Sequence, residues 1–165
     1  MGATKIFSTP LRYPGGKGKF SHFIKQIFTS NNLFDGHYVE PYAGGAGVAL
    51  ELLFHEYAST IHINDIDPAI YSFWHAATQQ TEQLCKLIHD TPVTMENWRH
   101  YKYILENTQD HSTLDVAMAT FFLNRTNRSG ILKAGVIGGQ DQAGKWKLDA
   151  RYNKKDLTSR IELIG

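Results

Sequence analysis

The sequence of 165 residues contains a single cysteine, Cys85, and no apolar run that approaches the ~20 residues a membrane helix needs. One cysteine excludes an internal disulfide and fits a reducing, cytoplasmic setting. Cys85 lies in Leu84–Ile88, so we interpret it as a buried structural thiol rather than a nucleophile. Residues 1–5 lack the apolar core of a secretory signal. We therefore expect a cytoplasmic globular protein, long enough for one domain with a real core.

The net charge is low, at +1, but the charged residues are distributed unevenly. Residues 1–34 hold five Lys or Arg and no acidic residue, and residues 35–119 hold three basic and twelve acidic residues. Residues 120–160 hold nine basic and three acidic residues. A solvated surface would account for charge alone, but the basic stretches are also rich in Gly, Asn, Tyr and Trp, which suit contact with phosphates and bases. The pattern predicts nucleic-acid contact.

Apolar periodicity predicts a β-α-β unit followed by a mainly helical region. An amphipathic helix should begin near Phe20, because apolar residues recur there at helical spacing. Strands are expected at 38–40 and 60–64, parallel to each other, with a buried helix over 48–57 between them. Residues 127–150 carry five glycines and should form a loop and hairpin. Further helices are expected near 69–78, 80–89, 94–107, 113–124 and 154–164.

Two glycine-rich turns and one acidic strand end are the most informative motifs. The turns are Arg12–Lys19 and Tyr38–Gly47, and the strand end is Asn64–Pro68. Glycine lets backbone approach a ligand closely, because no Cβ stands in the way. An acidic residue at the end of the next strand is where nucleoside-binding α/β folds place the acceptor for a ribose. Together these motifs predict a nucleoside site.

Other glycine motifs fit the sequence less well. A dinucleotide fold would need glycine at position 50, which is Leu50, and a phosphate loop would need Ser or Thr after Gly16-Lys17 or Gly18-Lys19. The histidines show no spacing typical of metal ligands, since Ser59 stands where a second histidine would have to follow His55. We therefore expect no metal. A plain structural role for the turns and carboxylates remains an alternative when each motif is taken singly.

The order of five motifs resembles one family, the Dam-like (alpha-group) adenine-specific DNA methyltransferases. The similar segments cover almost the whole chain: Arg12–Lys17, Glu40–Gly47, Asn64–Asp67, Phe121–Ile131 and Trp146–Lys155. The resemblance implies transfer of a methyl group from S-adenosylmethionine to the exocyclic amine of adenine in duplex DNA. It also implies an α/β fold, namely a Rossmann-like S-adenosylmethionine-dependent methyltransferase fold, here with an incomplete sheet and a mainly helical target-recognition insertion.

The resemblance further implies roles for individual residues and regions. Residues 1–68 match the cofactor-binding part, 69–153 the target-recognition region and 154–165 a return helix. The cofactor contacts carried over are Tyr13, Lys17, Glu40, Pro41, Gly44, Gly45, Gly47 and Asp65, with Asp65 as the acceptor for the ribose hydroxyls. The DNA contacts carried over are Asn124, Arg125, Arg128, Ser129, Lys133, Lys154 and Lys155. Of these, Lys133 matches a position that reads a guanine edge, and Arg128 and Ser129 match positions that enter the base stack.

The family's Asp-Pro-Pro-Tyr motif, which holds the target amine, does not occur in this sequence. We therefore expect an N-terminal portion of a methyltransferase, inactive alone and active with a complementing C-terminal chain. A binding module that holds DNA or S-adenosylmethionine without turnover is the alternative. A dinucleotide oxidoreductase is disfavoured by Leu50 and the cationic ends. A cytosine-ring methyltransferase is disfavoured because Cys85 follows Leu84 rather than proline.

Overall fold

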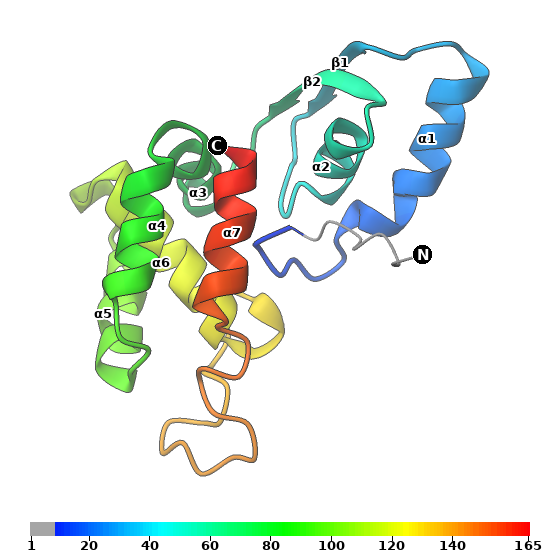
Figure 1. Cartoon of the computed structure of the whole chain (residues 1–165). Coiled ribbons are helices and arrows are strands. Elements are labelled where there is room, and N and C mark those ends of the chain that lie inside the picture. Colours follow the sequence, from blue (N-terminus) through cyan, green and yellow to red (C-terminus); the bar gives the residue numbers. More distant parts are fainter. Residues whose placement is uncertain (1–8) are drawn as a thin grey trace. The chain divides into compact units, whose positions relative to one another are not determined.

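The structure is a computed structural model and describes residues 9–165 (Figure 1). The chain divides into two compact units. The first contains Gly15–Asp65, and the second contains Pro10–Pro14 together with Ile66–Gly165. Within the described residues, no helix is long and apolar enough to cross a membrane.

The first unit is a small β-α-β layer. Its elements are η1 (Lys17–Phe20), α1 (Ser21–Ser30), β1 (Gly36–Glu40), α2 (Gly47–Phe54) and β2 (Ala58–Ile63). The two strands pair in parallel, from His37 opposite Thr60 to Glu40 opposite Ile63, which confirms the predicted unit. A short parallel pair needs a helix against it to bury its apolar side chains. Helix α2 packs against both strands, and α1 packs against α2 (Figure 1). The core of the unit comprises Phe28, Val48, Leu52 and Ala58.

The predicted helix over 48–57 ends earlier, at Phe54. The amide of Tyr57 bonds to the carbonyl of Leu52, and the amide of Glu56 bonds to that of Leu53. This is a Schellman-type end, in which one residue adopts a left-handed conformation. Here that residue is Glu56, at φ 59°, rather than the usual glycine, so the sequence carries no stop signal at this point.

The second unit is mainly helical. Its elements are α3 (Pro68–Gln79), α4 (Thr81–Asp90), α5 (Met95–Glu106), η2 (Thr108–Asp110), α6 (Thr113–Thr126), η3 (Arg128–Gly130) and α7 (Lys154–Ile164). Every residue of α6 from Val116 to Thr126 is buried, and this helix packs against α3, α4 and α5. Phe121 stacks on Phe73 with ring centroids 6.1 Å apart, and Tyr152 meets Phe121 edge-on at 5.4 Å. The predicted helices are thus confirmed to within about two residues.

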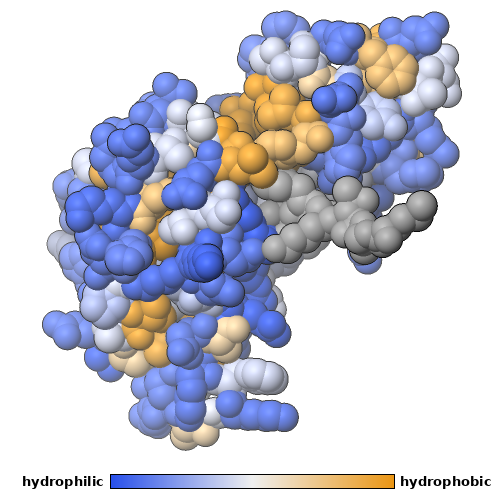
Figure 2. Space-filling model, viewed as in Figure 1, coloured by the Kyte–Doolittle hydropathy of each residue, from blue (hydrophilic) through white to orange (hydrophobic). Residues whose placement is uncertain are grey.

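Residues 127–150 follow the predicted loop, but the hairpin is reduced to one antiparallel bridge between Asn127 and Val136. The rest of this stretch consists of η3 and turns. Surface hydropathy also differs between the units. On the face shown in Figure 2, apolar residues gather on the first unit near α2 and its strands. The second unit is mostly hydrophilic on this face, with smaller apolar patches.

Candidate functional site

Lys17 of the first glycine-rich turn contacts the end of β1. Its Nζ lies 2.6 Å from Glu40 Oε1 and donates to the carbonyl of Tyr42 at 2.6 Å. Glu40 is buried, and its Oε2 accepts from the amide of Ala49 in the first turn of α2 at 3.1 Å. A carboxylate is favourable at a helix N-terminus, where backbone N–H groups point outward. Glu40 therefore connects the first glycine-rich turn to α2, the helix that follows the second glycine-rich turn.

The second glycine-rich turn is tightly folded. Gly44 and Ala46 both adopt left-handed conformations, at φ 49° and 48°. Gly44 and Gly45 are buried, whereas Pro41 is exposed. A Cβ on Gly47 would lie 3.3 Å from the Cα of Gly18. The two glycine-rich turns are thus in direct backbone contact, and glycine at position 47 permits this approach.

The strand end closes against the same turn. Asp65 Oδ2 accepts from the amide of Gly44 at 2.8 Å. The carbonyl of Asn64 accepts from the amide of Ala43 at 2.8 Å. The structure therefore brings together Lys17, Glu40, Gly44, Gly47 and Asp65 within the first unit. The first turn supplies a lysine cation, and the second turn supplies closely approachable backbone. Together with a strand-end carboxylate, such turns can hold a ligand with a ribose and a charged tail.

Asp67, two residues further, has a different role. Its side chain caps α3 by accepting from the amide of Ala69 at 2.9 Å, and Pro68 occupies the first helical position. Both features are typical of a helix N-terminus. The structural interpretation of a turn carboxylate therefore fits Asp67.

Tyr13 lies in the second unit, where it is exposed and lines a cavity of about 800 Å³. The cavity wall combines apolar side chains from α3 and α6 with a few polar groups, a composition typical of ligand pockets. Residues that line it include Tyr13, Asp67, Ile70, Leu123, Asn124 and Lys133. Tyr13, the predicted cofactor contact, and Lys133, the predicted base contact, thus line the same cavity.

Two predicted DNA contacts are buried rather than exposed. Asn124 bonds through its side chain to the backbone of Arg12 and Gly130. Arg125 donates from Nε and Nη2 to the carbonyl of Pro10. Burial and repulsion from Arg160 lower the pKa of Arg125 to about 10, which is consistent with an internal guanidinium. In this structure both side chains hold the N-terminal segment, and direct DNA contact by either finds no support in the geometry.

The loop after α6 presents the remaining predicted contacts. Arg128, Ser129 and Lys133 are exposed. Asn127 is bonded to this loop, because its Nδ2 donates to the carbonyls of Ile131 and Leu132. Its Oδ1 accepts from Nε1 of Trp98 at 2.7 Å.

Sequence analysis did not select Asn127 or Trp98. The only local signal was a pair of asparagines three residues apart at the end of an apolar helix. Such residues are disfavoured in a helix interior unless their side chains have backbone partners.

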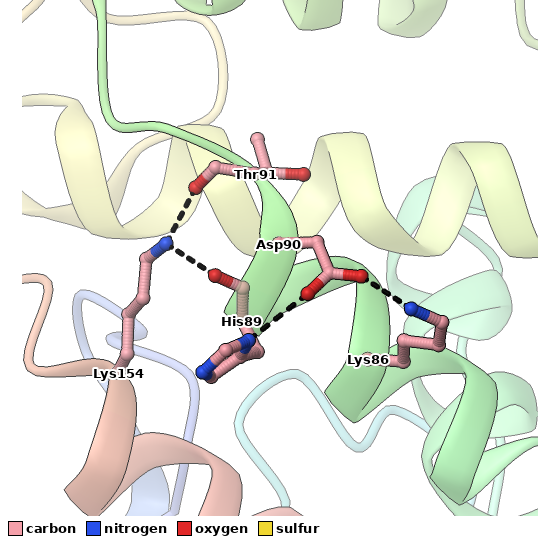
Figure 3. A network of polar contacts seen from close by, with 5 residues as sticks. All are labelled: Lys86, His89, Asp90, Thr91 and Lys154. Carbon is pink, nitrogen blue, oxygen red and sulfur yellow. Dashed lines mark hydrogen bonds and ion pairs between the residues drawn. The ribbon is translucent and has the colours of Figure 1, made fainter.

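Lys154 and Lys155 are adjacent in sequence but differ in environment. Lys154 Nζ donates to the carbonyls of His89 and Thr91, at 2.7 and 2.6 Å (Figure 3). These carbonyls end α4, where a cation is favourable. Beside them, Asp90 pairs with Lys86 and His89. Lys155 is exposed. Phosphate contact is therefore compatible with Lys155, whereas Lys154 already has two internal partners.

The geometry can be compared with known proteins. A family model described as D12 class N6 adenine-specific DNA methyltransferase matches residues 13–164. The chain belongs to this family. Family membership confirms the resemblance to Dam-like adenine methyltransferases and supports DNA adenine methylation as the general activity. Methyltransferases of this family use S-adenosylmethionine and act on DNA, so duplex DNA is the supported partner. A search of curated proteins found no match.

Proposed function

We propose that the first unit of this chain binds S-adenosylmethionine. The observation that carries the proposal is the direct bond between Asp65 and Gly44, which joins the strand-end carboxylate to the second glycine-rich turn. The contact of Gly47 with Gly18 adds the first turn to the same cluster. Three motifs that are separated in sequence thus meet at one place, in a family that uses this cofactor.

Each residue of the cluster has a role that its chemistry suits. A carboxylate at Asp65 accepts from the two hydroxyls of a ribose, as in other nucleoside-binding α/β folds. The turn Glu40–Gly47 offers close backbone approach to the amino-acid end of the cofactor. Lys17 supplies a cation that Glu40 orients at 2.6 Å. Tyr13, which belongs to the second unit, stays a predicted cofactor contact through its own ring, and Pro41 and Gly45 stay predicted contacts within the turn.

The second unit is the proposed DNA-binding part. Phosphate contacts position a protein on DNA, and base-edge contacts give sequence preference. Among the exposed residues, Arg128, Ser129 and Lys133 lie on the loop after α6, and Lys155 lies at the start of α7. We propose Lys133 as the base contact, because an ammonium can donate to the O6 and N7 of guanine. Lys155 would contact phosphate.

Methyl transfer needs acceptor groups that hold the exocyclic amine of a flipped adenine. The Asp-Pro-Pro-Tyr motif that supplies them in the resembling family does not occur among these 165 residues. We therefore propose that the 165 residues bind ligand and DNA, and that turnover requires these acceptors from a complementing chain. The parallel pair β1–β2 would then be part of a larger Rossmann-like sheet. A non-catalytic binding module is the second candidate, and the same missing motif favours it.

Isothermal titration calorimetry tests the proposal directly. S-adenosylmethionine should bind the 165-residue chain with measurable heat, and NAD should not, because the second turn lacks the glycine that a dinucleotide fold requires at position 50. Fluorescence anisotropy with a labelled duplex tests DNA binding on the same sample. Tighter binding of NAD than of S-adenosylmethionine would contradict the assignment.

A further inference from the structure

The last three residues of α6 and its cap residue are four buried polar residues in a row, of which Thr126 bonds within the helix, to the carbonyl of Phe122. Asn124, Arg125 and Asn127 are 1%, 9% and 1% exposed. Burying an amide or a guanidinium is unfavourable unless each polar atom has a partner. The partners of Asn124, Arg125 and Asn127 lie outside the helix, in the segment Pro10–Arg12, in the loop after α6 and, for Asn127, also at Trp98 of α5. The role of Asn124, Arg125 and Asn127 is therefore to fix the segments to which they are bonded.

Asn124 and Arg125 hold the segment Pro10–Arg12. Asn124 Oδ1 accepts from the amide of Arg12 at 2.7 Å, and its Nδ2 donates to the carbonyl of Arg12 at 2.7 Å. One amide side chain thus pairs with both backbone groups of one residue, as a neighbouring strand would. Arg125 Nε adds a bond to the carbonyl of Pro10 at 2.8 Å. The segment that leads into Tyr13 is therefore held at two residues, Pro10 and Arg12.

Asn124 and Asn127 hold the loop after α6. Asn124 Nδ2 also donates to the carbonyl of Gly130 at 2.9 Å. Asn127 Nδ2 donates to the carbonyl of Leu132 at 2.9 Å. Gly130 has a φ of 74°, and a Cβ there would lie 2.5 Å from the carbonyl oxygen of Arg12. Segment and loop are therefore in backbone contact, with Asn124 bonded to both.

We infer that Asn124 is a positioning residue for DNA site selection, which clamps Pro10–Arg12 to the loop Gly130–Lys133 so that the loop is formed before DNA arrives. The inference rests on the proposed function, in which Lys133 contacts a base. A preformed loop loses less conformational freedom on binding and holds its contacts in fixed register. Loss of the clamp should therefore reduce discrimination between DNA sequences more than it reduces binding to DNA in general.

The first experiment measures site selection by the full 165-residue chain. Wild type, Asn124→Ala and Ser112→Ala are each used to select from a duplex library with a randomised centre. Ser112→Ala is the matched control, because Ser112 caps the other end of α6 by accepting from the amide of Asp115 at 3.1 Å. Asn124→Ala should lose sequence enrichment at least about tenfold, with an unchanged salt dependence of bulk DNA binding. Ser112→Ala should keep the enrichment.

The second experiment measures hydrogen exchange of the backbone amide of Arg12, which bonds to Asn124 Oδ1. Exchange at Arg12 should be faster in Asn124→Ala and unchanged in Ser112→Ala. Asn124→Asp keeps the size and the acceptor for Arg12 but loses both donated bonds, so it should lose enrichment while the Arg12 amide stays protected. This variant decides the matter if Asn124→Ala does not fold.

The outcomes separate the clamp from the proposed function. Unchanged enrichment in folded Asn124→Ala, or an equal loss in Ser112→Ala, would overturn the positioning role. Wild type that binds no duplex at all would count against DNA binding by this chain, and the exchange result would then decide the clamp alone. In that case, faster exchange at Arg12 supports it and unchanged exchange overturns it.

Discussion

At the scale of single residues, Asp65 and Asp67 lie two positions apart and are bonded to different parts of the chain. Asp65 accepts from Gly44 in the second glycine-rich turn, and Asp67 accepts from Ala69 at the start of α3. A carboxylate bonded within a turn can orient a ligand, whereas a capping carboxylate stabilises its helix. This difference favours Asp65 over Asp67 as the proposed ribose contact.

The first prediction concerns this contact. Asp65→Ala should weaken binding of S-adenosylmethionine by about 1–3 kcal/mol, because the ribose hydroxyls and the Gly44 amide both lose an acceptor. Calorimetry at equal folded fraction measures the change. Glu56→Gln, an exposed carboxylate of the same unit, is the control and should bind as wild type. Equal affinity in Asp65→Ala and wild type would remove Asp65 from the site.

The second prediction compares two exposed lysines of the second unit, the proposed DNA-binding part. Lys133→Ala should alter the sequence preference of duplex binding by about 1–3 kcal/mol at one base position. Lys155→Ala should weaken binding to all duplexes alike and reduce the slope of log K against log salt by about one unit. Lys86→Ala, which removes a surface pair with Asp90, is the control. Binding that does not depend on salt would argue against phosphate contact altogether.

At the scale of elements, the segment Pro10–Arg12 and the loop after α6 approach so closely that only glycine fits at position 130. Gly139 has a similar backbone conformation, at φ 80°, but nothing lies within 4 Å of an added Cβ there. An alanine at position 139 therefore measures the cost of the left-handed conformation alone. An alanine at position 130 adds the cost of the clash with the Arg12 backbone.

The third prediction uses this pair. Gly139→Ala should reduce the free energy of unfolding by about 1–2 kcal/mol, from the left-handed conformation alone. Gly130→Ala should reduce it further, since its Cβ must also displace the Arg12 backbone. Urea denaturation of both variants measures the difference. Equal losses would show that the segment and the loop separate without cost.

The fourth prediction concerns the packing of α4 against α7. Burial, with a smaller contribution from Glu162, raises the pKa of Cys85 from 9.0 to about 11. A raised pKa in the folded state means that the neutral thiol stabilises the fold fully below pH 9, and that this contribution is lost as the pH rises toward 11. The free energy of unfolding should therefore fall over this range more in wild type than in Cys85→Ala.

Urea denaturation across this pH range checks the difference between the two proteins. Burial raises the pKa of Tyr152 as well, but that residue is present in both proteins, so the comparison isolates the thiol. Parallel curves for wild type and Cys85→Ala would contradict a structural role for the neutral thiol.

At the scale of the whole molecule, the chain combines a cluster suited to a nucleoside cofactor with a helical unit that carries exposed basic residues. Cofactor binding alone does not lower a reaction barrier, because only interactions that are stronger in the transition state than in the ground state accelerate the chemical step. The exocyclic amine of adenine needs acceptors that hold it toward the methyl group. Methyl transfer should therefore be measured with the chain alone and with the chain plus the Asp-Pro-Pro-Tyr acceptors.

The fifth prediction is that the 165 residues alone transfer no methyl group to duplex DNA at saturating S-adenosylmethionine. Adding a chain that carries Asp-Pro-Pro-Tyr should restore transfer, and the product should be N6-methyladenine rather than a methylated cytosine. Tritiated cofactor measures turnover, and mass spectrometry of the nucleosides identifies the product. The same added chain with Asp replaced by Ala is the control. Transfer by the 165 residues alone would show that another residue holds the amine.

The sequence by itself determined most of the elements of this protein and the order of its motifs, but not the end of α2 or the reduction of the hairpin to one bridge. The strands around Tyr38 and Ile61 and the helices from α3 to α7 follow from local apolar periodicity, which depends on neighbours within one or two turns. The proximity of Glu40 and Asp65 could also be anticipated, because parallel strands end at the same edge of a sheet. Lys17 was expected beside them only from the resemblance to the methyltransferase family.

The tertiary structure alone decided which polar residues face solvent. Asn124, Arg125 and Lys154 are polar residues in basic stretches, and their sequence context favours DNA contact for all three. In the fold, Asn124 and Arg125 bond to the segment Pro10–Arg12, and Lys154 bonds to the end of α4. These partners lie 63 to 115 positions away in the chain. Side-chain periodicity carries no information on such distant partners, and a buried hydrogen bond forms only when the whole unit has packed.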